Sequence, residues 1–229
     1  EDFRVIAVVQ QKTTIAIMSL QSGKGKEIKS PQDLIGKKVA HPTGSVIKTL
    51  CPIYAKLAGL SPDQIKAVNW IDGAGPQLPV ILANGQVDGI GQFVPALPTV
   101  QAAVKNQPVT VLSYSDYMSD LYGNVLVARN DIDPDLKRRF AKALDRSVHY
   151  AVDNPEEAGK LIHEANPGTP AVGAAKELEL LKAYVGKPQG DREMVARSIA
   201  LLHSVGLIPN PIEPEKIFDF SVADSIANS

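Results

Sequence analysis

The turn formed by Thr43, Gly44 and Ser45 has residue types suited to binding a small molecule. It follows the apolar stretch 38–41 and precedes a helical pattern, so we predict a strand, a tight turn and a helix capped by Ser45. Gly44 allows a close approach to the backbone, and the N–H groups of a first helical turn attract an anion or a carbonyl oxygen. This turn is therefore our main candidate for a ligand site. An ordinary capped turn is the alternative.

Two further strand ends carry residues that suit ligand binding. Asp72 begins the Gly-containing loop 72–75, and Gln92 and Phe93 end the stretch 87–93, whose glycines indicate a close approach to the backbone. In an open α/β sheet, such strand ends line one edge, where ligands collect. We expect the loop at Asp72 to contact the ligand, Gln92 to form a hydrogen bond with it, and Phe93 to stack on it. A simple turn and core packing are the alternatives.

The segment 113–124 adds Tyr117, Tyr122 and Asn124 to the candidates. A tyrosine offers a flat apolar ring with a polar end, which suits aromatic or zwitterionic ligands. We therefore expect these three residues to contact the ligand. Packing between two lobes, or in a hinge, is the alternative.

Little in the sequence indicates catalysis or metal binding. Ser45 has no evident His and Asp partners, the Gly-x-Ser-x-Gly pattern is absent, and no histidines stand at the spacing of a metal ligand set. His41 lies beside the candidate turn, where it could touch a ligand. The single cysteine, Cys51, lies in an apolar helical pattern that predicts a buried side chain, and it allows no internal disulfide. We predict no catalytic residue, no metal and no cofactor.

The composition limits the class of protein. The chain has 229 residues, of which 44% are hydrophobic and 21% charged, which is enough for one large domain or two small lobes. The formal net charge of -1 argues against a nucleic acid as the partner. No apolar run approaches the ~20 residues that a membrane-spanning helix needs.

Apolar stretches and helical patterns alternate between residues 37 and 112. Strands are expected at 3–9, 15–20, 38–41, 65–71, 87–93 and 109–112, and helices at 46–60, 76–84 and 95–106. The alternation predicts an α/β fold with a mostly parallel sheet, flanked by helices and connected by right-handed crossovers.

Helical patterns dominate the chain after residue 126. The first of them begins at Asp133, and its period predicts that Leu136 and Phe140 face the core while Lys137 and the other basic residues face the solvent. Further helices are expected from residues 154, 172 and 191. This part of the chain therefore supplies helices to cover a sheet.

The order of several motifs resembles a known family. These motifs are residues 28–40 (IKSPQDLIGKKVA), the Gly44-Ser45 turn, residues 83–89 (ANGQVDG) and residues 121–128 (LYGNVLVA). They resemble the type II periplasmic solute-binding proteins of ABC importers, and among them the NMT1/THI5-like branch. That branch includes binders of sulfonates, taurine, nitrate and thiamine-pyrimidine precursors.

The resemblance implies two α/β lobes with the ligand trapped between them. Residues 9–126 would form lobe two with half of the ligand cleft, and residues 1–8 and 127–229 would form a hinge strand and the helical remainder of lobe one. The implied location is periplasmic or otherwise extracytoplasmic. There the protein would capture a small polar or anionic organic molecule and deliver it to the membrane permease of an ABC importer. On this interpretation the protein is not an enzyme.

Two other functions share this fold and stay open at the level of sequence. One is an enzyme that makes the thiamine pyrimidine, whose Cys-rich motif is absent here, and the other is the ligand-sensing domain of a transcription regulator. Family members also begin with a signal peptide and with strand–helix repeats of lobe one, which do not precede Glu1 in this sequence. We therefore expect the N-terminal part of lobe one to be missing from it, and a dimer or swapped assembly to cover the apolar surface so exposed.

Overall fold

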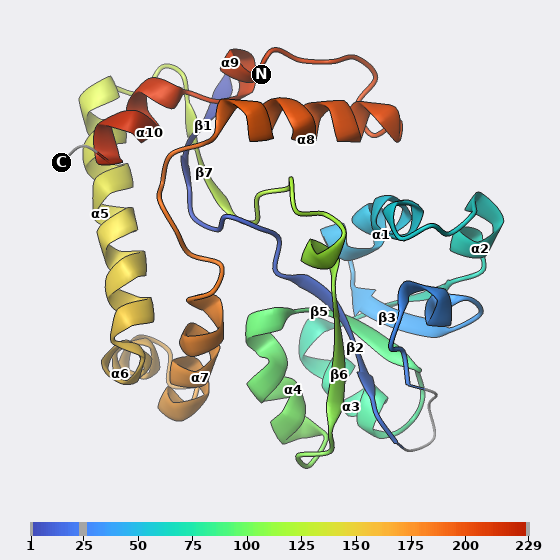
Figure 1. The fold of residues 1–229 in the computed structure, drawn as a ribbon. Coiled ribbons are helices and arrows are strands. Elements are labelled where there is room, and N and C mark those ends of the chain that lie inside the picture. Colours follow the sequence, from blue (N-terminus) through green and yellow to red (C-terminus); the bar gives the residue numbers. More distant parts are fainter. Residues whose placement is uncertain (1, 23–26, 228–229) are drawn as a thin grey trace. The chain divides into compact units, whose positions relative to one another are not determined.

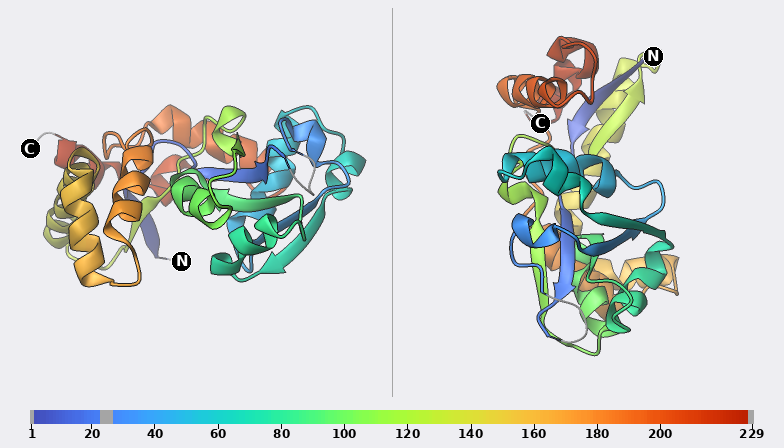
Figure 2. Two further views of the ribbon diagram at one scale, coloured as in Figure 1. Left: turned by 90° about the horizontal axis from the view of Figure 1, so that it is seen from below. Right: turned by 90° about the vertical axis from the view of Figure 1, so that its right-hand side faces the viewer.

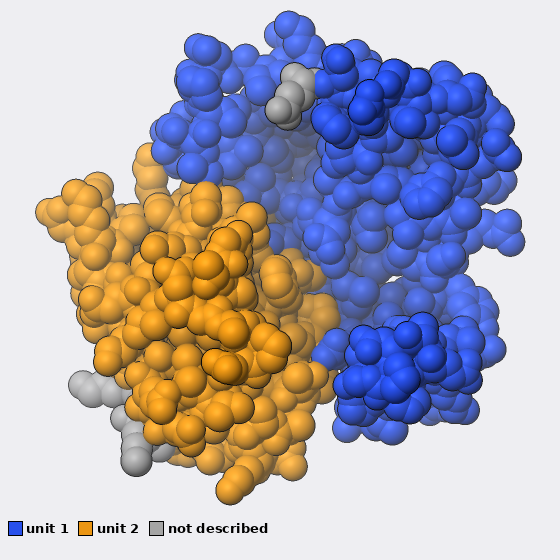
Figure 3. Space-filling model, turned by 180° about the vertical axis from the view of Figure 1, so that it is seen from behind, with its two compact units in different colours: residues 1–13, 119–229 blue, residues 14–118 orange. Residues whose placement is uncertain are grey.

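The computed structural model describes residues 2–22 and 27–227, which fold as two compact units (Figure 3). Unit 1 comprises Glu1–Thr13 and Ser119–Ser229, and unit 2 comprises Thr14–Met118. The division expected from the sequence, at residues 9 and 126, lies a few residues outside these boundaries. The assignment of the units to the two lobes of a periplasmic-binding fold remains a prediction.

Unit 2 is built on a five-stranded mixed sheet. Its strands are β2 (Ile15–Leu20), β3 (Lys38–Pro42), β4 (Asn69–Gly73), β5 (Gly89–Phe93) and β6 (Val109–Ser113), in the order β4-β3-β5-β2-β6. β3 runs parallel to β4 and β5, whereas β2 runs antiparallel to β5 and β6, so β2 alone is reversed. The mostly parallel sheet is confirmed with this exception. All six residues of β2 are buried, which places the strand inside the sheet.

Helices cover both faces of this sheet (Figures 1 and 2). They are α1 (Val46–Leu57), α2 (Pro62–Lys66), α3 (Leu78–Ala83) and α4 (Leu97–Ala103), with short 3-10 turns η1 (Pro31–Leu34), η2 (Gly75–Gln77), η3 (Val94–Ala96) and η4 (Tyr114–Asp116). On one face, Ile90 of β5 belongs to the same buried cluster as Leu78 and Leu82 of α3. On the other face, a Cβ atom at Gly91 would lie 2.6 Å from Cγ2 of Ile47 in α1. Gly91 therefore allows a core helix to approach closely.

Unit 1 contains a two-stranded antiparallel sheet of β1 (Phe3–Val8) and β7 (Val125–Arg129). Its helices are α5 (Pro134–Asp153), α6 (Pro155–Ala165), α7 (Ala171–Leu181), α8 (Arg192–Ser204), α9 (Pro214–Ile217) and α10 (Phe220–Ala227). One buried cluster joins Ile6 of β1 to Ala141 of α5 and Val222 of α10, and another joins Val8 of β1 to Val195 of α8. The predicted helical remainder of the chain is confirmed.

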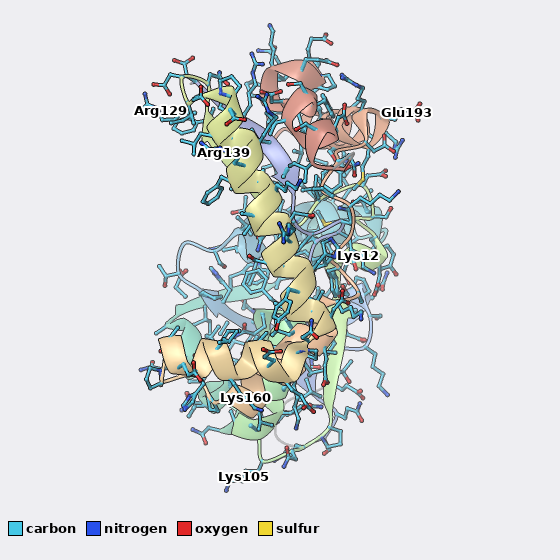
Figure 4. The ribbon with its side chains drawn as sticks, turned by 90° about the vertical axis from the view of Figure 1, so that its left-hand side faces the viewer. Lys12, Lys105, Arg129, Arg139, Lys160 and Glu193 are labelled. Carbon is cyan, nitrogen blue, oxygen red and sulfur yellow. The ribbon has the colours of Figure 1, made fainter. Side chains whose placement is uncertain are left out.

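The orientation predicted for α5 is wrong at its first turns. Leu136 and Phe140 are 47% and 59% exposed, whereas Lys137 is buried, with its Nζ donating to the carbonyl oxygen of Asn130 at 3.1 Å. The small residue Ala141, 1% exposed, faces the strands in their place. Arg139, labelled in Figure 4, lies on the solvent side of α5 and forms an ion pair with Asp135. A large apolar side chain therefore does not identify the buried face of this helix.

Candidate functional site

The carboxyl ends of β3, β4, β5 and β6 lie along one edge of the unit 2 sheet, because these four strands share a direction. The ladder between β3 and β4 ends at Pro42 opposite Gly73, and the N–H of Thr43 donates to the Gly73 carbonyl oxygen at 3.2 Å. Seven of the nine residues predicted for the site lie in the last two residues of these strands or just after them: Thr43, Gly44, Ser45, Asp72, Gln92, Phe93 and Tyr117. Their role in binding a ligand remains a prediction.

The turn between β3 and α1 has the predicted backbone but a different cap. Gly44 has φ +75°, a conformation that glycine adopts with little strain, and the N–H of Ser45 donates to the Pro42 carbonyl oxygen at 3.0 Å. Ser45 occupies the N-cap position, but its side chain accepts no hydrogen bond from α1. Its Oγ lies instead 3.4 Å from Nδ1 of His41. The first-turn N–H groups of α1 therefore have no hydroxyl acceptor from Ser45, and the predicted side-chain cap is wrong.

The sequence analysis placed His41 beside the candidate turn but did not predict which side chains it contacts. The side chain is 3% exposed, with Nδ1 3.0 Å from the Pro42 carbonyl oxygen and Nε2 3.4 Å from Oδ1 of Asp72. The ring also meets Trp70 edge-on, with 5.4 Å between ring centroids. His41 and Asp72 are paired in the register of two parallel strands. The signal available in the sequence was that both residues stand at the end of a predicted strand.

Aromatic side chains extend the site along the edge. Tyr117 is 43% exposed and meets the ring of Tyr54 edge-on at 5.5 Å, while Tyr54 stacks on Tyr114 at 4.3 Å. The Tyr114 hydroxyl donates to the carbonyl oxygen of Ile47 in α1 at 3.2 Å. Phe93 is 40% exposed, so its ring is not fully enclosed by the core. Two rings, those of Phe93 and Tyr117, therefore have surface available to a ligand.

Burial raises the pKa of three ionisable side chains behind this edge, those of Tyr54, Tyr114 and Cys51. It raises the pKa of Tyr54 and of Tyr114 above the usual tyrosine range. Burial likewise raises the pKa of the Cys51 thiol to about 11, and Cys51 is 1% exposed. The predicted buried side chain of Cys51 is confirmed. Such a thiol is a poor nucleophile near neutral pH, because the thiolate is the reactive form.

The two remaining predicted residues, Tyr122 and Asn124, lie in unit 1. The Tyr122 hydroxyl accepts a hydrogen bond from the N–H of Asp191 at 2.8 Å, and its ring packs against the buried cluster that contains Val8. The Asn124 backbone pairs with Gln10, whose Oε1 accepts from the Asn124 N–H at 3.1 Å, and the Asn124 side chain is exposed. Tyr122 thus has a structural role within unit 1, and a ligand role for either residue remains a prediction.

Among residues 2–22 and 27–227, no group of three or more His, Cys, Asp or Glu side chains is arranged to hold a metal ion. Within the same ranges, no helix has both the length and the apolarity needed to span a bilayer.

Fold and family follow from comparison with known proteins. Two α/β units with strand ends gathered at a sheet edge are typical of the type II periplasmic-binding-protein fold, and this chain has that fold. Residues 1–158 match the family model described as NMT1/THI5 like, and the chain belongs to this family. A relative from Brucella abortus (strain 2308), named as a binding protein, is 26% identical over 135 residues. That match covers 57% of this chain and 41% of the relative, so the chain matches less than half of its length.

Solved structures with the same fold include binding proteins and an enzyme. The periplasmic aliphatic sulphonate binding protein SsuA from Escherichia coli has a TM-score of 0.72 at 17% identity, over 95% of this chain and 69% of SsuA. The ligand-binding component of an ABC-type import system from Staphylococcus aureus has a TM-score of 0.68 at 14% identity, and the match covers 100% of this chain and 76% of that protein. A mutant of DszB, in complex with biphenyl-2-sulfinic acid, has a TM-score of 0.56 at 14% identity, and the match covers 99% of this chain and 79% of DszB.

Proposed function

We propose that this chain is the solute-binding component of an ABC importer and that it binds a small polar molecule at the carboxyl edge of the unit 2 sheet. The observation that carries the proposal is the start of α1, whose N-cap hydroxyl makes no bond to the helix although Gly44 opens the backbone in front of it. N–H groups so placed bind an anionic or carbonyl group of a ligand.

The family and the named relatives support the same function. The proteins similar to this chain include a periplasmic sulphonate binder and the ligand-binding component of an import system. A protein in that role works outside the cytoplasm and meets a membrane permease, which are the location and the partner that we propose. No bond is made or broken in the ligand.

An enzyme is the second candidate, and one observation favours it. The side chain of His41 lies between those of Ser45 and Asp72. Its Nδ1 is 3.4 Å from Ser45 Oγ, and its Nε2 is 3.4 Å from Asp72 Oδ1. DszB, described as a desulfurization enzyme, also has this fold. However, the nearer neighbour of Nδ1 is the Pro42 carbonyl oxygen, which can only accept a hydrogen bond. Nδ1 therefore carries a proton in this arrangement and cannot take one from Ser45, which favours binding over catalysis.

A ligand screen followed by one substitution tests the proposal. Thermal shift is measured with sulfonates, pyrimidines, nitrate, flavins and aromatic acids, and a ligand stabilises the folded chain by RT ln(1 + [L]/Kd). Val46→Pro then deletes a first-turn N–H of α1. Proline is compatible with this position, because Ser45 is extended (φ -76°, ψ 152°) and Val46 is the first helical residue.

We expect Val46→Pro to weaken binding roughly ten- to hundredfold, the value of a hydrogen bond to a charged group. The melting temperature without ligand should stay near that of the wild type. Val46→Ala is the matched control, because it removes the same half-exposed side chain but keeps the N–H. Equal affinities for Val46→Pro and Val46→Ala would exclude this turn as the site. Turnover of a compound, with no stabilising ligand in the screen, would support the enzyme instead.

A further inference from the structure

The ring of His41 lies between two loops at the carboxyl edge of the unit 2 sheet. Its Nδ1 is 3.0 Å from the Pro42 carbonyl oxygen and 3.4 Å from Oγ of Ser45, the residue before α1. Its Nε2 is 3.4 Å from Oδ1 of Asp72, near the end of β4. The side chain is 3% exposed, and Nε2 is buried without a hydrogen-bond partner. This nitrogen is therefore placed to respond to a proton.

Both ring nitrogens of His41 face groups that accept hydrogen bonds and cannot donate them. A carbonyl oxygen and an ionised carboxylate carry no proton to give. A neutral imidazole has one N–H, so whichever tautomer it adopts, it can donate to Pro42 or to Asp72 but not to both. The imidazolium has an N–H on each nitrogen and can donate to both. The geometry at the two ends of the ring therefore favours the protonated form.

The charged surroundings of the ring come from one strand. In the described part of the chain, the ion-pair neighbour of His41 is Asp72 of β4. On the other side, β5 brings Gly91 next to the His41 Cβ and adds no charge there. In α1, the charged residue closest in sequence is Lys48, whose side chain is exposed. Burial by itself disfavours a charged ring, whereas a neighbouring carboxylate favours it. Asp72 therefore decides whether Nε2 holds a proton.

The proton on Nε2 in turn affects the position of the Asp72 carboxylate. The distance of 3.4 Å from Nε2 to Oδ1 is longer than the ~2.7–2.9 Å of a charge-assisted hydrogen bond, and the Asp72 side chain is 59% exposed. With a proton on Nε2, the carboxylate is stabilised by closing this gap onto the charged ring. Without that proton, a lone pair faces the carboxylate, which then stays in the solvent.

We propose that His41 is a positioning residue of this edge, and that proton uptake at Nε2 draws Asp72 out of the solvent and onto the ring. The switch uses side chains of unit 2 alone, so it operates whether or not a solute binds there. Its consequence for binding rests on the proposed function. The segments 42–45 and 72–75 contain Asp72 but no lysine or arginine, so an acidic solute should bind more tightly as the pH falls.

The single tryptophan reports the state of the ring. Trp70 meets His41 edge-on, with 5.4 Å between ring centroids, and a protonated imidazole quenches the fluorescence of an adjacent indole. The other three histidines belong to unit 1. We expect the Trp70 emission of the full chain, without ligand, to fall in one transition between about pH 8 and pH 5. Circular dichroism over the same range checks that the chain stays folded.

Two variants separate the ring from its partner. His41→Gln keeps a side chain that can donate an N–H but does not titrate, so the transition should disappear. Asp72→Asn keeps the ring and removes the carboxylate, so the transition should move to lower pH by roughly one unit. His163→Gln is the matched control, because Nδ1 of His163 also faces a backbone carbonyl oxygen, at 2.9 Å, but lies in unit 1. It should leave the transition unchanged.

The nitrogen chemical shifts of the imidazole rings, measured by NMR, show directly whether Nε2 of His41 gains a proton in this range. A wild type without a transition, or a transition that survives in His41→Gln, would overturn the proposal. An unchanged midpoint in Asp72→Asn would overturn it as well, because Asp72 would then not hold the proton. If His41→Gln does not fold, Asp72→Asn and the nitrogen shifts decide. The proposed function is tested separately, by the ligand screen and Val46→Pro.

Discussion

The two units differ in what they leave exposed. In unit 2 the sheet is covered on both faces, and the exposed groups along its carboxyl edge include the carboxylate of Asp72 and the rings of Phe93 and Tyr117. In unit 1 a two-stranded sheet supports long helices, and α5 carries large apolar side chains, including Leu136 and Phe140, that are about half exposed.

This difference separates two kinds of surface. At the edge of unit 2, Nε2 of His41 is buried without a hydrogen-bond partner, although the core beneath it is well packed. A few polar groups that converge above a packed core are typical of a ligand site. On α5, large apolar side chains are exposed, and a hollow that this helix shares with α6 is lined by Arg146, Ser147 and Tyr150 together with apolar side chains. Substitutions in the two units should therefore act on different properties, and the following three experiments compare them.

The largest effect is expected in the core of unit 2. Ile90 is fully buried in the cluster formed with α3 and α4, so Ile90→Ala should lower the free energy of unfolding by about 2–5 kcal/mol. Urea unfolding is followed by the fluorescence of Trp70, the single tryptophan, which lies in unit 2. A loss below about 1 kcal/mol would contradict the close packing described for this unit.

A smaller effect is expected for the hydroxyl behind the site. Tyr114→Phe removes the hydrogen bond to the Ile47 carbonyl oxygen and should cost about 1–3 kcal/mol in the same measurement, because that acceptor is buried.

The same variant should change the response to alkaline pH. Burial raises the pKa of Tyr114 in the folded state, whereas in the unfolded chain it is about 10. Above pH ~10 the unfolded chain loses this proton and the folded chain keeps it, so stability falls as the pH rises. The wild type should therefore lose more stability than Tyr114→Phe between about pH 8 and pH 11. Equal losses would mean that Tyr114 ionises freely in the folded chain.

The smallest effect on stability is expected on α5. Phe140 is 59% exposed, so Phe140→Ser should change the free energy of unfolding by no more than about 0.5 kcal/mol, measured by circular dichroism. It should also reduce the binding of a hydrophobic dye, because it removes exposed apolar surface. The comparison between the units would fail if this variant were as destabilised as Ile90→Ala.

Much of the fold could be predicted from the sequence, because local patterns determine it. Alternating strands and helices in unit 2 and the caps of the later helices are short-range signals. Asp133, for example, accepts from the N–H of Leu136 at the predicted start of α5. The orientation of α5 was not predictable in this way, because burial of Lys137 in place of Phe140 depends on which side of the helix meets the strands.

The candidate site could also be predicted only in part, because local sequence patterns locate strand ends but do not determine the contacts between them. Strand ends identified Ser45, Asp72 and Phe93, since the carboxyl ends of co-directional strands meet at one edge. The contacts of His41 with Ser45 and Asp72 were missed, because they depend on the register between β3 and β4 and on the rotation of the Ser45 hydroxyl. Both are tertiary features that no short sequence pattern encodes.

The pairing of β2 with β6 has a consequence for how the chain could be cut and rejoined. Ala16 near the start of unit 2 is paired with Ser113 near its end, and in unit 1 the N–H of Gly123 donates to the Gln10 carbonyl oxygen at 3.0 Å. In each unit, the two points at which the chain passes to the other unit therefore lie next to each other. Residues 14–118 have the architecture of an insertion, which could be excised and closed with a short linker, leaving a gap in unit 1 that one tight turn would bridge.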